Sequence, residues 1–167
     1  MKKIFSIVIL AILTIACSDD DGQIELQNTD VIGTWARTVA IGDGDKEYIT
    51  TYEFRLSGTY TLKVFIWNTA ENSLVGYVSE QTGNYLIRDN EMTLKAETML
   101  GIAANEEASY VAYDELVELN VPEAVTVEYT TIIEEDKTSL KLVYPPCEPN
   151  ESCLGSLTFI KVLEANL

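Results

Sequence analysis

The sequence predicts an all-β protein, a single antiparallel up-and-down barrel of about eight or nine strands with one long insertion. Three observations predict this class. From Val31 onward, apolar and polar residues alternate with a period of two, which is typical of half-buried strands and not of helices. Turn residues such as Ser57-Gly58 and Asp89-Asn90 separate the alternating segments by short connections. An antiparallel meander of this length removes its free edges most simply by closing into a barrel.

The expected strands follow one another along most of the chain. Segments 47–56 and 59–68 flank Ser57-Gly58 and form a predicted hairpin, and segments 83–88 and 92–96 form a second one around Asp89-Asn90. Residues 98–123 carry no clean period and are expected to form an elaborated loop over a barrel mouth, with a helical turn and a short strand at 110–113. The remaining expected strands are 33–40, 74–80, 125–135, 140–144 and 156–162.

The first residues have the composition of an export signal. Lys2 and Lys3 precede an apolar run, 4–15, that is too short to span a bilayer comfortably, so residues 1–16 are expected to be a cleaved signal peptide. The junction 13–17 resembles the lipobox of bacterial lipoproteins, which implies that Cys17 carries fatty acyl chains such as palmitate and anchors the protein to a membrane. The alternative is an ordinary signal peptide followed by a chance cysteine.

Residues 17–30 are expected to be an acidic, flexible linker, and residues 31–167 the barrel domain. The run Ser18-Asp19-Asp20-Asp21-Gly22 resembles the acidic signal that exports lipoproteins of Bacteroidota to the cell surface. This resemblance implies an outer-membrane protein, lipid-anchored and facing the cell exterior. The alternatives are a merely solvated linker and a location on the periplasmic face.

The charge of the chain excludes one class of partner. The sequence has 11 Lys and Arg against 27 Asp and Glu, a formal net charge of −16. Nucleic acids and anionic lipid surfaces bind proteins largely through Lys and Arg, so neither is an expected partner of the folded domain.

Side chains for catalysis or for holding a metal are scarce. The chain has no histidine, which removes the usual proton shuttle, the Ser-His and Cys-His pairs and the imidazole ligands. Cys147 and Cys153 are expected to form a disulfide in an oxidising envelope. Residues 42–47 place carboxylates at alternate positions but do not complete a calcium loop. We therefore expect no enzyme, no cofactor and no metal, with a carboxylate-only hydrolase as the remaining alternative.

Several short motifs, taken in order, resemble the lipocalin-like domains of Bacteroidota lipoproteins. They are Gly33-Thr34-Trp35, Phe54 to Gly58 with Tyr60, Gly83-Asn84-Tyr85, and Asp89-Asn90 followed by Thr93-Leu94. The resemblance implies a barrel in which Trp35 packs across the closed end beneath a basic residue of the last strand, and Lys161 is the candidate for that residue. It implies little about activity.

Two sets of residues are candidates for binding. The inward-facing set either lines a cavity for a small apolar ligand or simply fills the barrel. Phe65 and Trp67 face the opposite way, so they either pack under the insertion or form an exposed patch for an envelope protein or a polysaccharide. The inward-facing set comprises Trp35, Tyr52, Phe54, Tyr60, Leu62, Tyr85, Met92, Leu94, Tyr129, Leu140, Leu142 and Phe159.

Overall fold

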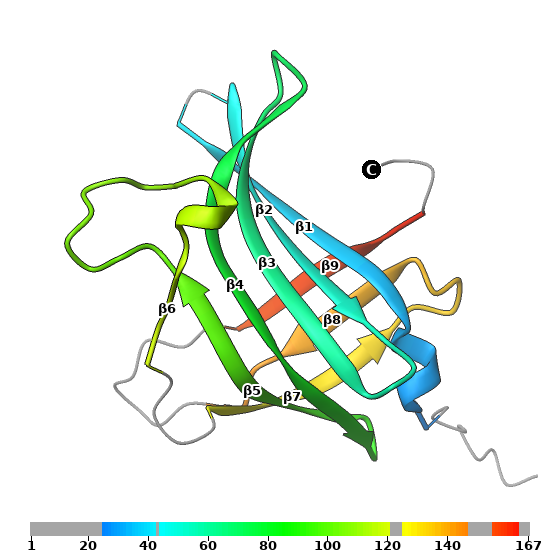
Figure 1. Cartoon of the computed structure of the whole chain (residues 1–167). Coiled ribbons are helices and arrows are strands. Elements are labelled where there is room, and N and C mark those ends of the chain that lie inside the picture. The colour runs from blue at the N-terminus through cyan, green and yellow to red at the C-terminus, as the bar shows by residue number, and fades with distance from the viewer. Residues whose placement is uncertain (1–24, 43, 121–124, 147–154, 164–167) are drawn as a thin grey trace, which may run out of the picture.

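A computed structural model describes residues 25–42, 44–120, 125–146 and 155–163 (Figure 1). Eight strands form a closed antiparallel barrel in the order β4-β3-β2-β1-β9-β8-β7-β5, and pairing of β4 with β5 closes it. A short ninth strand, β6, pairs with the upper part of β5. The predicted fold class is confirmed. The strands are β1 (Gly33–Ile41), β2 (Lys46–Phe54), β3 (Thr59–Asn68), β4 (Ser73–Arg88), β5 (Glu91–Gly101), β6 (Val117–Glu118), β7 (Thr126–Ile133), β8 (Ser139–Val143) and β9 (Ser156–Val162).

The structure joins two of the predicted strands into one. Segments 74–80 and 83–88 are parts of the 16-residue β4, which stays continuous through a bulge between Thr82 and Gly83. A Cβ at Gly83 would collide with the carbonyl oxygen of Lys95, so glycine lets β4 and β5 approach closely there. The sequence pattern predicted one strand that ends at Glu80 and a second that begins at this glycine, with a break at residues 81–82.

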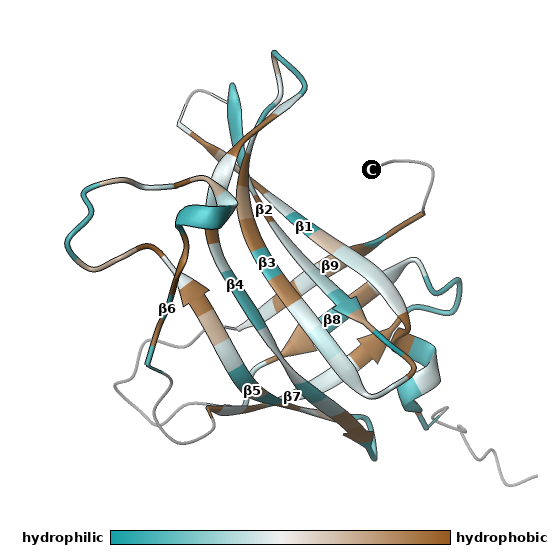
Figure 2. Cartoon of the chain, in the orientation of Figure 1, coloured by the Kyte–Doolittle hydropathy of each residue, from teal (hydrophilic) through white to brown (hydrophobic). Residues whose placement is uncertain are grey.

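Both predicted hairpins are present. Asp89 and Asn90 have positive φ angles of 51° and 64° and connect Arg88 to Glu91 in a two-residue turn. The other turn begins earlier than predicted, since β2 ends at Phe54 and Leu56 is 77% exposed in the turn. Figure 2 shows the alternation of apolar and polar residues along the strands on which the fold prediction depends.

One end of the barrel, which we call the closed end, is sealed by the segment before β1. The 3-10 turn η1 (Asn28–Val31) lies across it, and the indole nitrogen of Trp35 donates a hydrogen bond to the Val31 carbonyl at 2.6 Å. The Asn28 side-chain oxygen accepts a bond from the backbone N–H of Ile87 at 2.8 Å, and that of Asn90 accepts one from Leu26 at 2.8 Å. The predicted linker 17–30 is therefore too long at its C-terminal side, because residues 26–30 belong to the folded domain.

At the other end, which we call the open end, the strands diverge (Figure 1). β1 pairs with β2 along all nine of its residues but with β9 only at residues 34–36. β5 pairs with β7 at residues 91–95 and with β6 at residues 100 and 101. The long strands β1 to β5 thus extend beyond the closed cylinder as a curved sheet. No helix in the described ranges is long and apolar enough to cross a membrane.

Candidate binding sites

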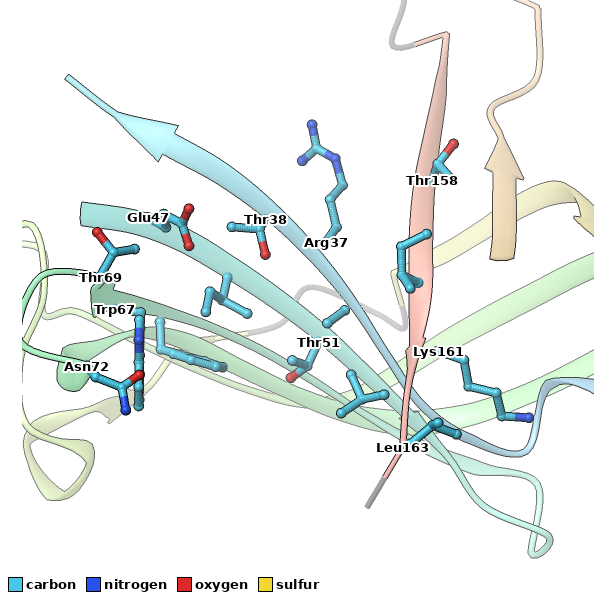
Figure 3. A pocket seen from close by; sticks show the side chains of 15 residues that line it. Arg37, Thr38, Glu47, Thr51, Trp67, Thr69, Asn72, Thr158, Lys161 and Leu163 are labelled. Carbon is cyan, nitrogen blue, oxygen red and sulfur yellow. The ribbon is translucent and has the colours of Figure 1, made fainter. Parts of the chain in front are cut away.

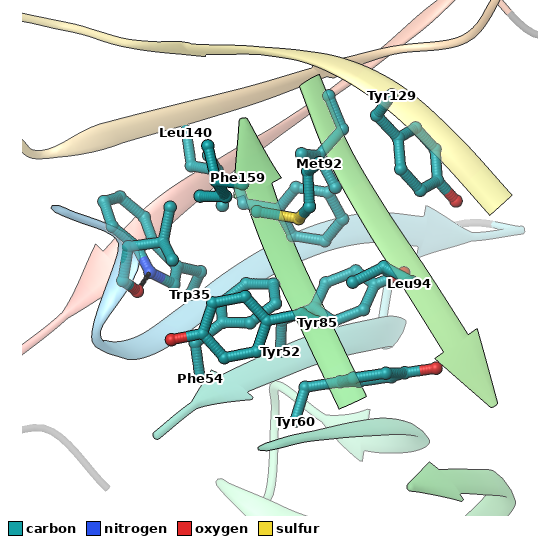
Figure 4. Close-up of a cluster of buried hydrophobic side chains, with 13 residues drawn as sticks. Trp35, Tyr52, Phe54, Tyr60, Tyr85, Met92, Leu94, Tyr129, Leu140 and Phe159 are labelled. Carbon is teal, nitrogen blue, oxygen red and sulfur yellow. Dashed lines mark hydrogen bonds between the residues drawn. The ribbon is translucent and has the colours of Figure 1, made fainter. Parts of the chain in front are cut away.

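The structure places all twelve inward-facing candidates inside the barrel. Eleven are buried in one hydrophobic cluster, and Leu62 is partly buried against it (Figure 4). The rings of Tyr52 and Phe54 stack at a centroid distance of 5.4 Å, and Phe159 meets Tyr52 edge-on at 5.3 Å. Tyr85 contacts Phe54 edge-on at 4.9 Å. These side chains fill the closed half of the barrel with one another.

Lys161 lies where the resemblance places a basic residue. It pairs across the strands with Trp35, and its Nζ is 5.1 Å from the centroid of the indole ring. The lysine stem also approaches Gly33, at the start of β1. A cation over the face of a buried tryptophan is attracted by the electron density of the ring, so this contact helps to fix the closed end.

Several tyrosines belong to the core of the barrel or pack against it. The rings of Tyr129 and Tyr144 meet edge-on at a centroid distance of 4.9 Å, and the Tyr60 hydroxyl accepts a hydrogen bond from the side-chain amide of Gln81. Burial away from water raises the pKa of Tyr52 and of Tyr129 far above the ordinary value of a phenol. Both hydroxyls therefore stay protonated at physiological pH and can donate hydrogen bonds.

A large hollow lies outside the barrel. A groove of about 1280 Å³ runs over the outer faces of β1, β2, β3 and β9 (Figure 3). Ile49 on β2 lies directly opposite Phe65 on β3, and Glu47 lies opposite Trp67. Trp67 and Asn72 are at one end of the groove, and Lys161 and Leu163 are at the other. The hydroxyl-bearing residues of the lining are Thr38, Thr51, Thr69 and Thr158, and its aliphatic residues include Ile49, Ile160, Val162 and Leu163.

Phe65 and Trp67 combine features of both predicted alternatives. The Phe65 ring is 6.1 Å from that of Tyr77, which in turn meets Tyr113 of the insertion edge-on at 5.1 Å. The insertion therefore packs one ring away from Phe65. Trp67 is half-buried and lines the outer groove.

The insertion is fixed beside β4 at the open end. Val111 forms a two-hydrogen-bond bridge with Tyr77, and a Cβ at Gly76 would meet the ring of Tyr110. The Tyr113 hydroxyl donates to the carboxylate of Glu80 at 3.0 Å. The predicted short strand at 110–113 is thus a single bridge, followed by the 3-10 turn η2 (Tyr113–Glu115) and β6. Figure 1 shows the segment alongside β4 and β5.

Several predicted features lie outside the described residues. They include Cys17, the disulfide partners Cys147 and Cys153, and Asp43 of the acidic loop. Among the described residues, no group of three or more acidic, cysteine or histidine side chains is placed to hold a metal ion.

The sequence analysis missed the groove residues other than Phe65 and Trp67. Part of the groove could have been predicted from the hairpin of segments 47–56 and 59–68. The turn at Gly58 fixes the register of the two strands and so places Ile49 opposite Phe65. The contribution of β9 could not be predicted in the same way, since it depends on pairing between strands far apart in the sequence.

Searches with this chain found no matching family model, no matching curated protein and no matching solved structure.

Proposed function

We propose that this chain is a lipid-anchored protein of the bacterial outer membrane that acts without enzymatic activity as an interaction module. Its partner binds in the outer groove, and the barrel core is a filled scaffold. One observation carries this proposal: the closed half of the barrel is packed with its own aromatic side chains, whereas the groove outside presents Trp67 and Phe65. Large aromatic residues in a hollow are the side chains that contribute most to binding interfaces.

The position of the folded segment nearest Cys17 supports a particular orientation of the module. Residues 26–31 are bound to the closed end, and residues 17–25 span at most roughly 30 Å when fully extended. A lipid on Cys17 therefore tethers the domain by its closed end, within roughly 30 Å of the membrane. The open end lies at the opposite end of the barrel, and the groove runs along the side of the barrel from Trp67 to Lys161, where a partner can reach it.

A second candidate function is supported by the tyrosine hydroxyls. A small, mostly apolar ligand bound inside the barrel would contact the core tyrosine Tyr129 and the adjoining Tyr144, whose rings meet edge-on at 4.9 Å. Few polar groups at the base of an apolar site are typical of small-molecule pockets. In this case stabilisation against heat by a lipid, a bile acid or haem would persist in Trp67→Ala, because Trp67 is on the outer face.

Lipid anchoring is tested by growing cells with labelled palmitate and comparing the wild-type chain with Cys17→Ser. We expect label on the wild-type protein and none on the variant. A wild-type chain that carries no label would remove the membrane anchor from the proposal.

The groove is tested by placing a photo-crosslinking amino acid at Trp67 and, as a matched control, at Leu86. Leu86 is an exposed apolar residue of β4 that does not line the groove. We expect one stoichiometric crosslinked partner on living cells from position 67 and none from position 86. Equal crosslinking from both positions, or from neither, would contradict binding in the groove.

A further inference from the structure

The part of β1 in the open end has a neighbouring strand on one side only. Residues 37–41 pair with β2, but within the described ranges no strand pairs with them on the side of β9. The pairing of β1 with β9 stops at Ala36 and Ile160, and beyond this point the two strands diverge. Such an unpaired edge is a template for another strand, and folded proteins ordinarily cover or charge it.

The hydrogen-bonding pattern identifies which backbone groups of β1 point away from β2, to the side where residues 37–41 have no described neighbouring strand. The N–H of Arg55 donates to the Thr59 carbonyl, so odd-numbered residues of β2 bond to β3 and even-numbered ones bond to β1. Tyr52 lies opposite Trp35, and therefore odd-numbered residues of β1 bond to β2. The N–H and C=O groups of even-numbered residues point the other way.

The hydrogen bonds of β9 lead independently to the same assignment for β1. The N–H of Lys161 donates to the Thr138 carbonyl, on the side away from β1, which leaves Ile160 as the residue that bonds to Ala36. The next even-numbered residues of β1 are Thr38 and Ala40. Their backbone groups point to the space that β9 has left, and both residues are exposed.

The corresponding edge on the other side of the open end is covered. β5 separates from β7 in the same manner, but the chain returns along it, with β6 opposite Leu100 and Gly101 and the N–H of Leu119 donating to the Met99 carbonyl. The N–H of Ala96 likewise donates to the Val125 carbonyl. Of these two edges, the one of β5 is paired with other segments, whereas the one of β1 has no paired segment within the described chain.

We propose that an extended peptide segment of another protein adds to β1 as a strand along residues 37–41. This inference rests on the proposed function, because it identifies the partner of the outer groove as a peptide strand. The reason is geometric: only an extended polypeptide repeats donors and acceptors at the spacing that Thr38 and Ala40 present. The open edge is five residues long, which corresponds to roughly 17 Å of partner strand.

The groove and the charge set the composition of the partner. Alternate side chains of an added strand lie on the outer face, next to Thr38 and Ile160, where β-branched and aromatic residues pack well. The groove lining holds two cations, Arg37 and Lys161, and one carboxylate, Glu47, so it is the long-range field of a chain with a net charge of −16 that attracts a cationic segment. We therefore expect a peptide in which Val, Ile or aromatic residues alternate with Lys, Arg or Thr.

The experiment selects peptides from a random twelve-residue display library on immobilised residues 18–167. The best peptide is then made synthetically, and its affinity is measured for the wild-type chain and for three variants. Thr38→Pro removes an edge N–H that bonds to no described strand, and proline is tolerated at such positions. Thr38→Val keeps the edge, and Trp67→Ala removes the groove aromatic.

We expect selected peptides of the stated composition, with affinity at least tenfold weaker for Thr38→Pro and unchanged within twofold for Thr38→Val. N-methylation of alternate peptide residues, which removes donors from the probe and leaves the protein untouched, gives the same loss even if Thr38→Pro is poorly folded. Trp67→Ala also weakens binding, since side chains of the strand enter the groove.

Three results would overturn the inference. Binding sensitive to Trp67→Ala but not to Thr38→Pro or N-methylation would leave the groove as the site and exclude strand addition. Peptide binding that none of these changes affects, or a library that yields no enriched peptide, would contradict strand addition. A neutral oligosaccharide then tests the groove: binding that depends on Trp67 would keep the groove as the site of an interaction module. No binding of the oligosaccharide would contradict the proposed function as well. A dimer in light scattering that Thr38→Pro dissociates would identify a second copy as the occupant.

Discussion

Strands β1 to β5 run through both the closed end and the open end of the barrel, but within the described residues the edge of β1 is paired at the closed end and unpaired at the open end. At the closed end β1 is paired on both sides, η1 covers the cylinder, and Trp35 is fully buried beneath Lys161. At the open end residues 37–41 of β1 are paired on one side, and Val39 is 40% exposed. The contacts that stabilise the fold are therefore concentrated at the closed end. The open end can then tolerate a strand edge whose backbone groups have no partner strand in the described chain, next to the groove.

The largest expected effect compares the two tryptophans. Trp35→Ala removes a fully buried ring and its hydrogen bond to Val31, and should lower the free energy of unfolding by about 3–5 kcal/mol. Trp67→Ala should cost about 1 kcal/mol or less, because Trp67 is only half-buried on the outer face. Urea unfolding followed by circular dichroism measures both. Equal losses would mean that the groove is part of the core.

A second comparison uses two glycines. An alanine at Gly83 collides with the backbone of β5 and should destabilise the protein by about 1–3 kcal/mol or more. The matched control is Gly155→Ala, where a Cβ meets nothing within 4 Å. A Gly83→Ala variant as stable as this control would show that β4 is not continuous through the bulge.

The contact between Lys161 and Trp35 should have a smaller effect. Lys161→Met keeps most of the stem and removes the cation, so we expect a loss of about 0.5–2 kcal/mol. Lys141→Met, on the exposed side of β8, is the control and should be neutral. If both variants unfold at the same urea concentration, the cation contributes nothing to the closed end.

The smallest effect concerns Asp30 in the η1 turn. The backbone N–H of Gln27 and the ammonium of Lys137, 2.9 Å away, lower the pKa of this carboxyl below its ordinary value of 3.8. The ionised form therefore stabilises the fold at pH values above about 4, and that contribution disappears as the pH falls through the lowered pKa. Asp30→Asn should cost at most about 1 kcal/mol at pH 7, and this cost should shrink as the pH falls below 4. A cost that is independent of pH would contradict an electrostatic role.

The fold followed from the sequence where local patterns decide it. The alternation in segments 47–56 and 59–68 and the Asp89-Asn90 turn determine strands, faces and register over short distances. The prediction failed at residues 81–82, where it ended one strand and began another at Gly83. A bulge beside a glycine that approaches the Lys95 carbonyl closely cannot be told from a strand break when the neighbouring strand β5 is unknown. It failed at residues 26–30 because polar side chains such as Asn28 act there as caps for strands more than 50 residues away.

The binding sites were less predictable than the core. Tyr52, Phe54 and Phe159 are buried because they occupy the alternate positions of their strands that face the inside of the barrel. The groove and the open edge depend instead on where β1 and β9 stop pairing, which is decided by the twist and length of strands far apart in the sequence. No pattern within one strand contains that information.

The difference between the two ends is tested most directly by hydrogen exchange of the free protein, read at individual backbone amides of β1. Ala36 and Thr38 point their N–H groups to the same side of the same strand, but only Ala36 has β9 as a partner. We predict that the Ala36 amide exchanges with the slowest amides of the core and that Thr38 and Ala40 exchange at least a hundredfold faster. Protection of Thr38 and Ala40 equal to that of Ala36 would contradict an open β1 edge.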